Sequence, residues 1–487
     1  MELADTIFTA EALPGSGKTE KFISKLPSML TEGLRVLYSL PTNKLTKELE
    51  VRLRSAGVAA RCINSDSTSA VIRKVNEALS EQASEVLVIT HEALQRVSPV
   101  CLRGWTLIVD EVPSVSCCQS HNFNHGSYQT GLAPFVSIDE AARATVAPED
   151  RGELEAIVRE GASQSAYQQT TLEVFEALLD QHSIVEIDPL DRNMKRLVRI
   201  VAYKDYLSRF AQADQVHILA NNVTQTLLGV QAQAQGWTFE RSTFTPTFDG
   251  YNCSVTIYPM VAGDKWSKSL CLTTPDGKVQ DNWSDDVQGK KLLDNLYEHV
   301  DGEPLLVFTH SWMAYQHPSN GRECSIDSRG LNNLKDYRKA ACFQHGNMSP
   351  DDLRSMDTLS QMMGVSSEQI RKALTYERFY ESSLQCFLRT AIRDRDNKSQ
   401  VSLFTQNEDM ANHLKGCLGR TALIDRSLAH APYPRAKSDE AMARGALKAR
   451  AMYLVIEEGM SRSQVAKALN QPIPTIKRWT KGIGQAA

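Results

Sequence analysis

The chain has 487 residues, of which 42% are hydrophobic and 23% are charged, and its formal net charge is −4. This length predicts about two to four domains, and the composition excludes a wholly disordered chain. The apolar runs are too short to cross a bilayer, and the first ten residues lack the basic and apolar regions of a secretory signal. The ten cysteines form no CxxC pair, which disfavours a zinc or iron–sulfur site and favours a reduced, cytoplasmic protein.

A phosphate-binding loop is the first motif of the chain. Residues 6–12 form an apolar β-run, and residues 12–19 fit the P-loop pattern with Ala in place of its first Gly. The loop glycines let backbone N–H groups surround phosphates at the start of a helix, while Lys18 reaches the β- and γ-phosphates and the Thr19 hydroxyl binds Mg²⁺. The predicted nucleotide-binding residues of this loop are Gly15, Ser16, Gly17, Lys18 and Thr19.

Three further apolar runs, at residues 34–40, 85–90 and 105–110, alternate with helical patterns. This alternation predicts a parallel sheet with helices on both faces, whose ligands gather at the carboxyl ends of the strands. The runs end in Pro41-Thr42, Thr90-His91 and Asp110-Glu111.

The Asp-Glu pair carries the second piece of chemistry. Asp110 is placed to hold the Mg²⁺ water shell, and Glu111 beside it is placed to orient and deprotonate an attacking water. The alternative is a surface turn, which the preceding strand and the upstream P-loop disfavour.

In this order, the four motifs resemble the first motor domain of superfamily 2 helicases. The resemblance implies that the P-loop and the Asp-Glu pair face ATP. It also implies that Pro41, Thr42, Thr90 and His91 contact a nucleic-acid backbone. The sequence departs from the DEAD-box subgroup, because Val112-Pro113 stand in place of Ala-Asp.

Residues 115–214 carry no chemical motif, and we predict a helical insertion with helices near residues 138–147, 148–160 and 166–180. Such an insertion could contact DNA, act as a wedge or be a structural addition. Ala220-Asn221-Asn222 follows the next apolar run and resembles the helicase motif that couples hydrolysis to movement, although an ordinary turn would have the same pattern.

A second sheet is expected from runs near residues 303–310, 340–343 and 399–404, with Thr309 at a strand end where it would contact DNA. Asp327–Asn332 resembles a helicase motif that would place Arg329 and Gly330 at the cleft. Gln385, Arg389 and Arg393 are spaced four apart and would share one helix face. The resemblance implies that Arg393 is an arginine finger and Arg389 its γ-phosphate partner; the alternative is an amphipathic helix with a basic face.

The last 57 residues form a basic tail. Residues 431–487 contain ten Lys or Arg and four Asp or Glu, so the tail carries +6 and the rest of the chain −10. After a helix at residues 439–458, the pattern predicts a helix–turn–helix with Ser461 as N-cap, Asn470 in the turn and Pro474 in the first turn of the second helix. The solvent-facing residues that would touch the major groove and phosphates are Thr475, Lys477, Arg478 and Lys481. A protein-interaction module is the alternative.

The sequence therefore predicts an α/β protein with two RecA-like parallel-sheet domains, a helical insertion and a C-terminal all-α helix–turn–helix domain. The expected boundaries are 1–114 for the first RecA-like core, 115–214 for the insertion, 215–240 for the return to the first domain, 241–430 for the second domain and 431–487 for the tail.

The predicted activity is an ATP- and Mg²⁺-dependent DNA helicase or translocase of phage or mobile-element type. It would act in replication initiation or DNA processing, in the cytoplasm of a bacterium or phage-infected host. We expect single-stranded DNA in the motor cleft, duplex DNA at the tail, and replication proteins as further partners. The alternatives are an ATP-switched DNA-binding initiator or regulator that does not unwind, and a viral DNA-packaging ATPase.

Overall fold

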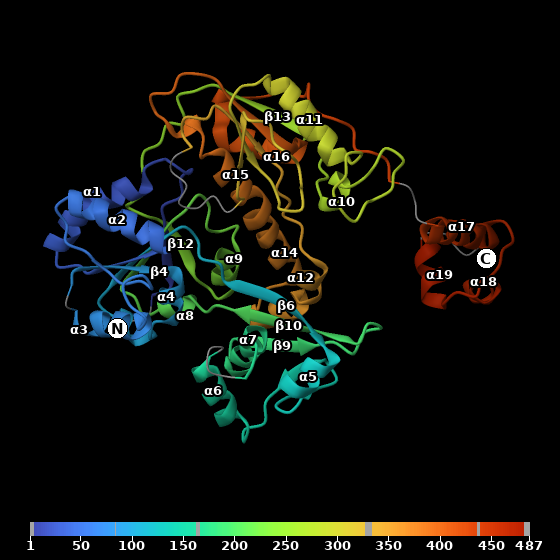
Figure 1. The fold of residues 1–487 in the computed structure, drawn as a ribbon, viewed down its shortest axis with the longest axis horizontal. Coiled ribbons are helices and arrows are strands. Elements are labelled where there is room, and N and C mark those ends of the chain that lie inside the picture. Colours follow the sequence, from blue (N-terminus) through green and yellow to red (C-terminus); the bar gives the residue numbers. More distant parts are fainter. Residues whose placement is uncertain (1–3, 83, 162–165, 327–333, 436–438, 482–487) are drawn as a thin grey trace. The chain divides into compact units, whose positions relative to one another are not determined.

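The computed structural model of the chain describes residues 4–82, 84–161, 166–326, 334–435 and 439–481 (Figure 1). The chain divides into two compact units. The first contains residues 1–266, 296–311 and 316–429, and the second contains residues 267–295, 312–315 and 430–487. Across the described residues, no helix is both long and apolar enough to cross a membrane.

A seven-stranded sheet, parallel throughout, forms the first part of the first unit, in the order β12-β1-β11-β5-β2-β4-β3. Its strands are β1 (Thr6–Thr9), β2 (Val36–Leu40), β3 (Arg61–Cys62), β4 (Val86–Thr90), β5 (Thr106–Asp110), β11 (Gln215–Leu219) and β12 (Thr238–Arg241). All five residues of β2 are buried, as expected of a central parallel strand with helices on both faces. The parallel sheet predicted from the apolar runs is confirmed.

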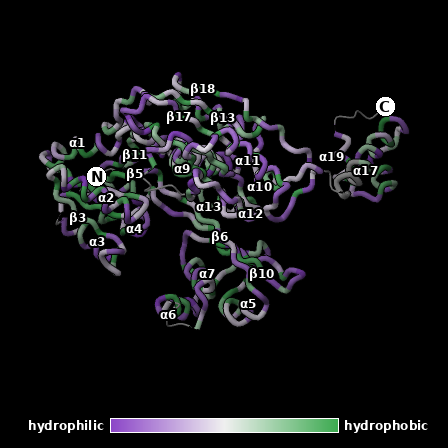
Figure 2. Tube along the Cα trace, turned by 45° about the horizontal axis from the view of Figure 1, so that its top comes forward, coloured by the Kyte–Doolittle hydropathy of each residue, from purple (hydrophilic) through white to green (hydrophobic). Residues whose placement is uncertain are grey.

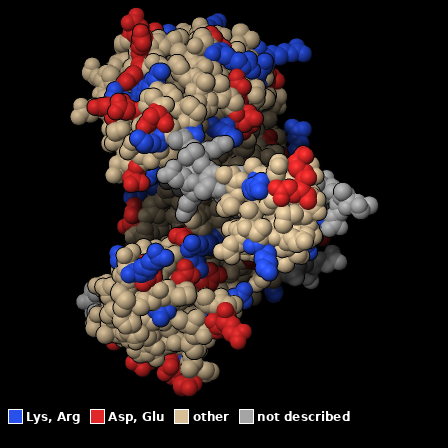
Figure 3. All heavy atoms as spheres, turned by 90° about the vertical axis from the view of Figure 1, so that its right-hand side faces the viewer, with Lys and Arg blue, Asp and Glu red and all other residues tan. Residues whose placement is uncertain are grey.

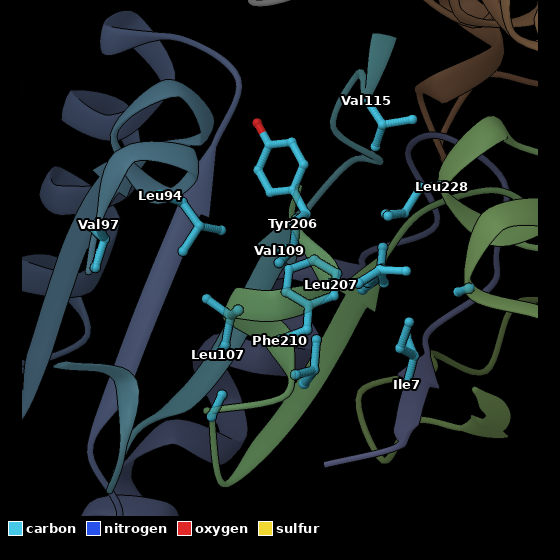
Figure 4. Close-up of a cluster of buried hydrophobic side chains, with 14 of the residues drawn as sticks. Ile7, Leu94, Val97, Leu107, Val109, Val115, Tyr206, Leu207, Phe210 and Leu228 are labelled. Atoms are coloured by element: carbon cyan, nitrogen blue, oxygen red, sulfur yellow. The ribbon is translucent and has the colours of Figure 1, made fainter. Parts of the chain in front are cut away.

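Helices cover this sheet on two sides, and each side has its own hydrophobic core. On one side, α1 (Lys18–Thr31) contributes Phe22 and α2 (Asn43–Ser55) contributes Leu49. The other side contains α3 (Val71–Glu81), α4 (His91–Arg96), α8 (Leu207–Phe210) and α9 (Leu227–Ala234). Figure 4 shows this second core, where Leu107 and Val109 of β5 lie beside Phe210 of α8. In Figure 2, which colours the chain by hydropathy, hydrophobic segments alternate with hydrophilic ones along the strands and helices of this sheet domain.

The predicted helical insertion is wrong, because the chain after β5 folds around an antiparallel sheet of five strands in the order β6-β10-β9-β8-β7. The strands are β6 (Ser116–Asn124), β7 (Ser137–Ile138), β8 (Arg143–Thr145), β9 (Ser183–Ile187) and β10 (Lys195–Tyr203). The helices are α5 (His125–Gly131), α6 (Arg151–Glu160) and α7 (Gln169–Leu179). The second and third predicted helices are thus present as α6 and α7, whereas the one predicted near residues 138–147 is replaced by β7, a turn and β8. This subdomain has a separate core that includes Leu154, Phe175 and Val198.

A second parallel sheet of six strands follows, in the order β15-β14-β16-β17-β13-β18. Its strands are β13 (Val255–Val261), β14 (Leu305–Phe308), β15 (Gly321–Cys324), β16 (Lys339–Cys342), β17 (Val401–Asn407) and β18 (Ala422–Ile424). The helices between β16 and β17 are α12 (Pro350–Arg354), α13 (Met356–Met363), α14 (Ser367–Thr375) and α15 (Ser382–Phe387), with a π-helical segment at Tyr376–Glu381. Helix α16 (Glu408–Leu418) follows β17.

The single helix predicted to carry Gln385, Arg389 and Arg393 ends early. Helix α15 stops at Phe387, and Arg393 lies in a separate 3₁₀ turn at Ala391–Arg393. The break lies at Thr390, whose backbone is extended and whose hydroxyl donates to the carbonyl of Phe387. A β-branched residue that bonds a preceding carbonyl competes with continuation of the helix.

The second unit contains α10 (Lys268–Cys271), the first part of α11 (Gln288–Val300) and three C-terminal helices. These three are α17 (Asp439–Ile456), α18 (Arg462–Ala468) and α19 (Ile473–Trp479), which share a core that includes Ala451, Val465 and Ile476. Ser461 caps α18 in a reciprocal bond with Gln464, and Asn470 between α18 and α19 has a φ of 48°. Both features agree with the cap and the turn expected from the sequence.

Candidate nucleotide-binding and hydrolysis site

The P-loop joins β1 to α1, which begins at Lys18 directly after Gly17, and both Gly17 and Gly15 have a positive φ. Gly15 has a φ of 80° and Gly17 a φ of 95°, conformations that residues with a Cβ rarely adopt. The loop therefore presents its backbone N–H groups at the start of a helix, which is the arrangement that binds phosphates.

The Lys18 ammonium folds back onto this loop. Its Nζ donates to the carbonyl oxygens of Ala12 at 2.5 Å and Leu13 at 3.2 Å. Burial lowers the pKa of Lys18 to about 8, although the nearby carboxylates of Asp110, Glu381 and Glu111 favour the charged form. A phosphate in the loop would replace the two carbonyls as the partner of this ammonium.

Asp110 ends β5 beside the start of α1. Its Oδ2 accepts from the Thr19 hydroxyl at 3.3 Å and from the Tyr38 hydroxyl at 2.8 Å. Burial raises the pKa of Asp110, while these two hydrogen bonds and the charge of Lys18 act in the opposite direction. A hydroxyl and a carboxylate are hard oxygen ligands, so Thr19 and Asp110 fit Mg²⁺. The ion would neutralise phosphate charge.

Glu111 follows in a strained conformation, with a φ of 66° that is uncommon for a residue other than glycine. Its backbone N–H donates to the Leu219 carbonyl at 3.1 Å, which joins the end of β5 to the end of β11. Such outliers persist where the surrounding structure imposes them, and they cluster at functional sites. Here the conformation holds Glu111 at the carboxyl edge of the sheet.

Arginines from the second sheet domain approach the same loop. A Cβ placed on Gly15 would lie 3.1 Å from Cγ of Arg393, so this glycine allows the Arg393 side chain to approach the loop closely, in addition to adopting its positive φ. Nε of Arg393 is buried and has no hydrogen-bond partner in the described structure, and burial together with the charge of Arg389 lowers the pKa of Arg393 to about 10. Arg395, which the sequence analysis missed, donates from Nη2 to the Ser16 carbonyl at 3.2 Å.

These groups line one cavity of about 1390 Å³ between the two sheet domains of the first unit. The residues predicted for nucleotide binding and catalysis that line it are Gly15, Ser16, Gly17, Lys18, Thr19, Asp110, Glu111, Gln385, Arg389 and Arg393. Arg329 and Gly330, also predicted here, lie outside the described residues. The cavity thus brings together predicted residues that are up to 378 positions apart in the sequence, from Gly15 to Arg393.

Two acidic residues of the cavity were missed by the sequence analysis. Glu381 accepts from Nδ2 of Asn221 at 2.8 Å and from Nε2 of Gln385 at 2.9 Å. Glu377 accepts from the backbone N–H of Leu227 at 2.6 Å, and burial raises its pKa to about 7. Both acids continue the four-residue spacing of Gln385 and Arg389 toward the N-terminus, which was the available sequence signal.

The side chains predicted to touch nucleic acid are placed differently. Pro41 lines the nucleotide cavity. The hydroxyls of Thr42 and Thr90 accept from backbone N–H groups and cap α2 and α4, and His91 is buried at 8% exposure. Thr309 is also buried, and its hydroxyl donates to Glu323 at 2.8 Å. These four residues hold local structure, and their contact with nucleic acid stays a prediction.

In α19, Lys477 and Arg478 are exposed and Thr475 is partly exposed, and Lys481, in the turn after this helix, is also exposed. Their side chains are therefore available to a ligand, whereas Ile476 and Trp479 of the same helix face the core. On the face of the molecule that Figure 3 draws, Lys and Arg side chains are interspersed with Asp and Glu. Charge alone therefore marks no nucleic-acid path on that face.

Comparison with known proteins gives one family match. Residues 3–119 match the DEAD/DEAH box helicase family, which agrees with the helicase resemblance predicted for this part of the chain. Among solved structures, S. tokodaii Xpd4 has 12% sequence identity and a TM-score of 0.49, over 86% of this chain and 96% of that chain. An XPD helicase gives 11% identity, a TM-score of 0.49 and the same two shares. A DEAD-box helicase bound to single-stranded RNA gives 11% identity and a TM-score of 0.29, over 98% of this chain and 82% of that one. A search of the curated proteins gives no match.

Proposed function

We propose that the chain is an ATP-driven motor that couples hydrolysis to movement on, or unwinding of, DNA. The observation that carries this proposal is the shared cavity, in which a P-loop and an Asp-Glu pair from one parallel-sheet domain face arginines from the other. A site built from two domains changes when they move, so its chemistry can be coupled to displacement along a strand. The DEAD/DEAH box helicase match of residues 3–119 supports the same reading.

In this mechanism the loop N–H groups and Lys18 bind the β- and γ-phosphates, and Thr19 and Asp110 would hold a Mg²⁺ ion that neutralises phosphate charge. Glu111 orients a water and takes its proton as the water oxygen attacks the γ-phosphorus. The bond between that phosphorus and the β–γ bridging oxygen breaks, which leaves ADP and phosphate. Arg389 and Arg393 stabilise the negative charge that spreads over the transferred group, and Arg393 is our candidate for the arginine finger.

We also propose that the C-terminal helices bind duplex DNA as a helix–turn–helix, with α19 in the major groove. The capped α18, the left-handed Asn470 and the exposed Lys477 and Arg478 support this role. A sequence-reading module attached to a motor suits replication initiation or DNA processing, in a bacterium or a phage-infected cell. Replacing Lys477 and Arg478 by Ala should weaken duplex binding. The slope of the logarithm of the binding constant against the logarithm of the salt concentration should also become shallower by about one for each residue replaced.

The decisive test is steady-state ATP hydrolysis without nucleic acid and with single-stranded DNA, duplex DNA or single-stranded RNA. We expect DNA to stimulate ATP hydrolysis and the Lys18→Ala change to abolish this hydrolysis. Hydrolysis that is stimulated by RNA and not by DNA would overturn the DNA assignment. Unstimulated or absent hydrolysis, with DNA still bound through the C-terminal helices, would reject the motor in favour of an ATP-switched initiator or regulator. A strand-displacement assay then separates unwinding from translocation alone.

A further inference from the structure

A second cavity of the first unit lies beside the nucleotide cavity and has a volume of about 750 Å³. It is lined by residues from α14, the π-helical segment and α16, together with Gln225 just before α9. No motif of the sequence marks this groove, and none of the predicted nucleic-acid contacts lies in it. The side chains that line the groove determine which ligands it can bind.

Three aromatic rings line the groove. The rings of Tyr380 and His413 lie 4.7 Å apart between centroids, and Tyr376 lies 6.4 Å from each of them. Tyr380 donates from its hydroxyl to Asp409 at 2.5 Å, which fixes its ring on the groove wall. Tyr380 and His413 are only partly buried, so an incoming flat ring can reach them.

The remaining lining is cationic or amide-bearing. Arg371 and Lys372 lie on α14 with exposed side chains, and Lys372 forms an exposed ion pair with Glu368 one turn away. Gln225 and Asn412 are exposed and supply amide donors and acceptors. Aromatic rings that accept a stacked base, next to cations that accept a phosphate, are the combination by which proteins hold unpaired nucleotides.

Tyr376 connects this groove to the nucleotide cavity. Its ring forms part of the groove wall, while its hydroxyl lies 3.4 Å from Oε2 of Glu381 and 3.4 Å from Nδ2 of Asn221. Glu381 and Asn221 both line the nucleotide cavity. Tyr376 itself is buried at 6% exposure, so a base stacked on Tyr380 or His413 would act on Tyr376 through those neighbouring rings.

We propose that this groove holds unpaired nucleotides of a single strand, and that the Tyr376 hydroxyl transmits their presence to Asn221 and Glu381. The proposal rests on the motor function proposed above, because it adds a strand contact to that motor. Base and phosphate could also come from a free mononucleotide. We favour the strand, because the groove is open, and the assay below includes AMP to separate the two sources.

Strand binding is measured first, by fluorescence anisotropy of a labelled oligothymidylate on the full chain. We expect Tyr380→Ala or Arg371→Ala to weaken binding about ten-fold, as loss of one stacking or phosphate contact does. Tyr380→Phe keeps the ring, so its affinity for the oligothymidylate should lie within about two-fold of that of the unaltered chain. This variant separates loss of the stacking ring from a folding defect. Arg420→Ala, an exposed arginine elsewhere in the unit, is the matched control for Arg371 and should change nothing.

Coupling is measured second, through Tyr376→Phe. This change keeps the ring and removes only the hydroxyl, so the oligothymidylate should bind normally while strand-stimulated ATP turnover falls toward the unstimulated rate. Unchanged binding by Tyr380→Ala and Arg371→Ala would overturn the groove, and full stimulation in Tyr376→Phe would overturn the coupling. Displacement of the labelled oligothymidylate by AMP as effectively as by unlabelled oligothymidylate would assign the groove to a mononucleotide. Because anisotropy needs no hydrolysis, these outcomes are distinguishable from failure of the motor itself.

Discussion

Glu381 and Asn221 join the two sheet domains inside the nucleotide cavity, with Nδ2 of Asn221 donating to Oε2 of Glu381 at 2.8 Å. The other carboxylate oxygen accepts from Gln385 at 2.9 Å. Asn221 lies two residues after Leu219, whose carbonyl accepts from the backbone N–H of Glu111. The Glu381 carboxylate thus contacts the segment after β11, which is bonded to the backbone of Glu111, the candidate base. It also contacts α15, the helix that leads to the candidate arginines Arg389 and Arg393.

Exchanging the donor and the acceptor tests this relationship. Asn221→Ala or Glu381→Ala should each lower kcat for ATP about ten-fold with little change in KM, because alignment of the domains is lost while phosphate binding is kept. The double change Asn221→Asp with Glu381→Gln restores a donor facing an acceptor and also keeps the bond from Gln385, so it should recover most of kcat. If the exchanged pair loses as much kcat as the Ala variants, the hydrogen bond between Asn221 and Glu381 is not what aligns the domains. The double Ala variant should be no worse than either single change.

Nucleotide affinity should depend on pH through Lys18. Burial lowers its pKa to about 8, so the ammonium is charged below that pH and loses its proton as the pH rises through it. The charged form binds phosphates, so Kd for a fluorescent ATP analogue should rise by up to about ten-fold for each pH unit above 8. Lys18→Arg retains the charge and should give a nearly flat profile. An equal rise in Lys18→Arg would assign the pH dependence to another group.

Glu377 should make stability depend on pH. Burial raises its pKa to about 7, so the buried carboxyl favours its protonated form. Its stabilising contribution is complete below its ordinary pKa and is lost as pH rises through 7. Glu377→Gln mimics the protonated form and can accept the same bond from Leu227. It should match the unaltered chain in acid and be more stable by up to about 3 kcal/mol near pH 8.

Urea unfolding in acid and near pH 8 measures the difference in the free energy of unfolding between Glu377→Gln and the unaltered chain. Glu368→Gln is the matched control, because Glu368 is exposed and forms an exposed ion pair with Lys372, and it should change stability little at either pH. A Glu377→Gln variant that is less stable than the unaltered chain at high pH would show that the ionised carboxylate is the stabilising form.

The parts of the fold that the sequence predicted have local signals. The P-loop spacing, the apolar run of β2 and the Ser461 cap are each set by neighbouring residues, and the structure contains all three. Strand β6 has no such signal, because its residues are mostly polar and half-exposed and its pairing partner, β10, is distant in sequence. A pairing that depends on tertiary contacts cannot be obtained from residue patterns alone.

The clustering of the three side chains was predicted better than their local structure. The expected helix through Arg393 ends at Phe387, yet Gln385, Arg389 and Arg393 all line the nucleotide cavity. Their spacing predicted a shared helix face, and all three reach one cavity although the helix breaks before Thr390. Glu381 was missed because an acid on a helix is ordinary until its partner Asn221, which comes from the other sheet domain, is known.

The antiparallel subdomain that replaces the predicted helical insertion should depend on one buried ion cluster. Arg199 donates to Glu186 at 3.1 Å and to both oxygens of Asp188 at 2.7 Å, while Thr358 of α13 donates to Glu186 at 2.5 Å. Arg199 and Glu186 are only 6% and 7% exposed. Arg199→Ala would leave a buried carboxylate without its cation, so we expect a loss of about 3–5 kcal/mol.

Hydrogen exchange in β9 and β10 measures this loss where it occurs, because both strands carry members of the cluster. The control is Arg354→Ala, which removes an exposed guanidinium 3.7 Å from Asp188 and should cost less than about 1 kcal/mol. The combined change Arg199→Met and Glu186→Met removes the two most buried charges of the cluster, while Asp188 is partly exposed and keeps Arg354 at 3.7 Å. It should restore much of the lost protection, because two buried apolar chains replace the unpaired carboxylate of Glu186. If the pair of changes is as damaging as Arg199→Ala alone, the loss comes from the packing of Arg199 and not from the charge left on Glu186.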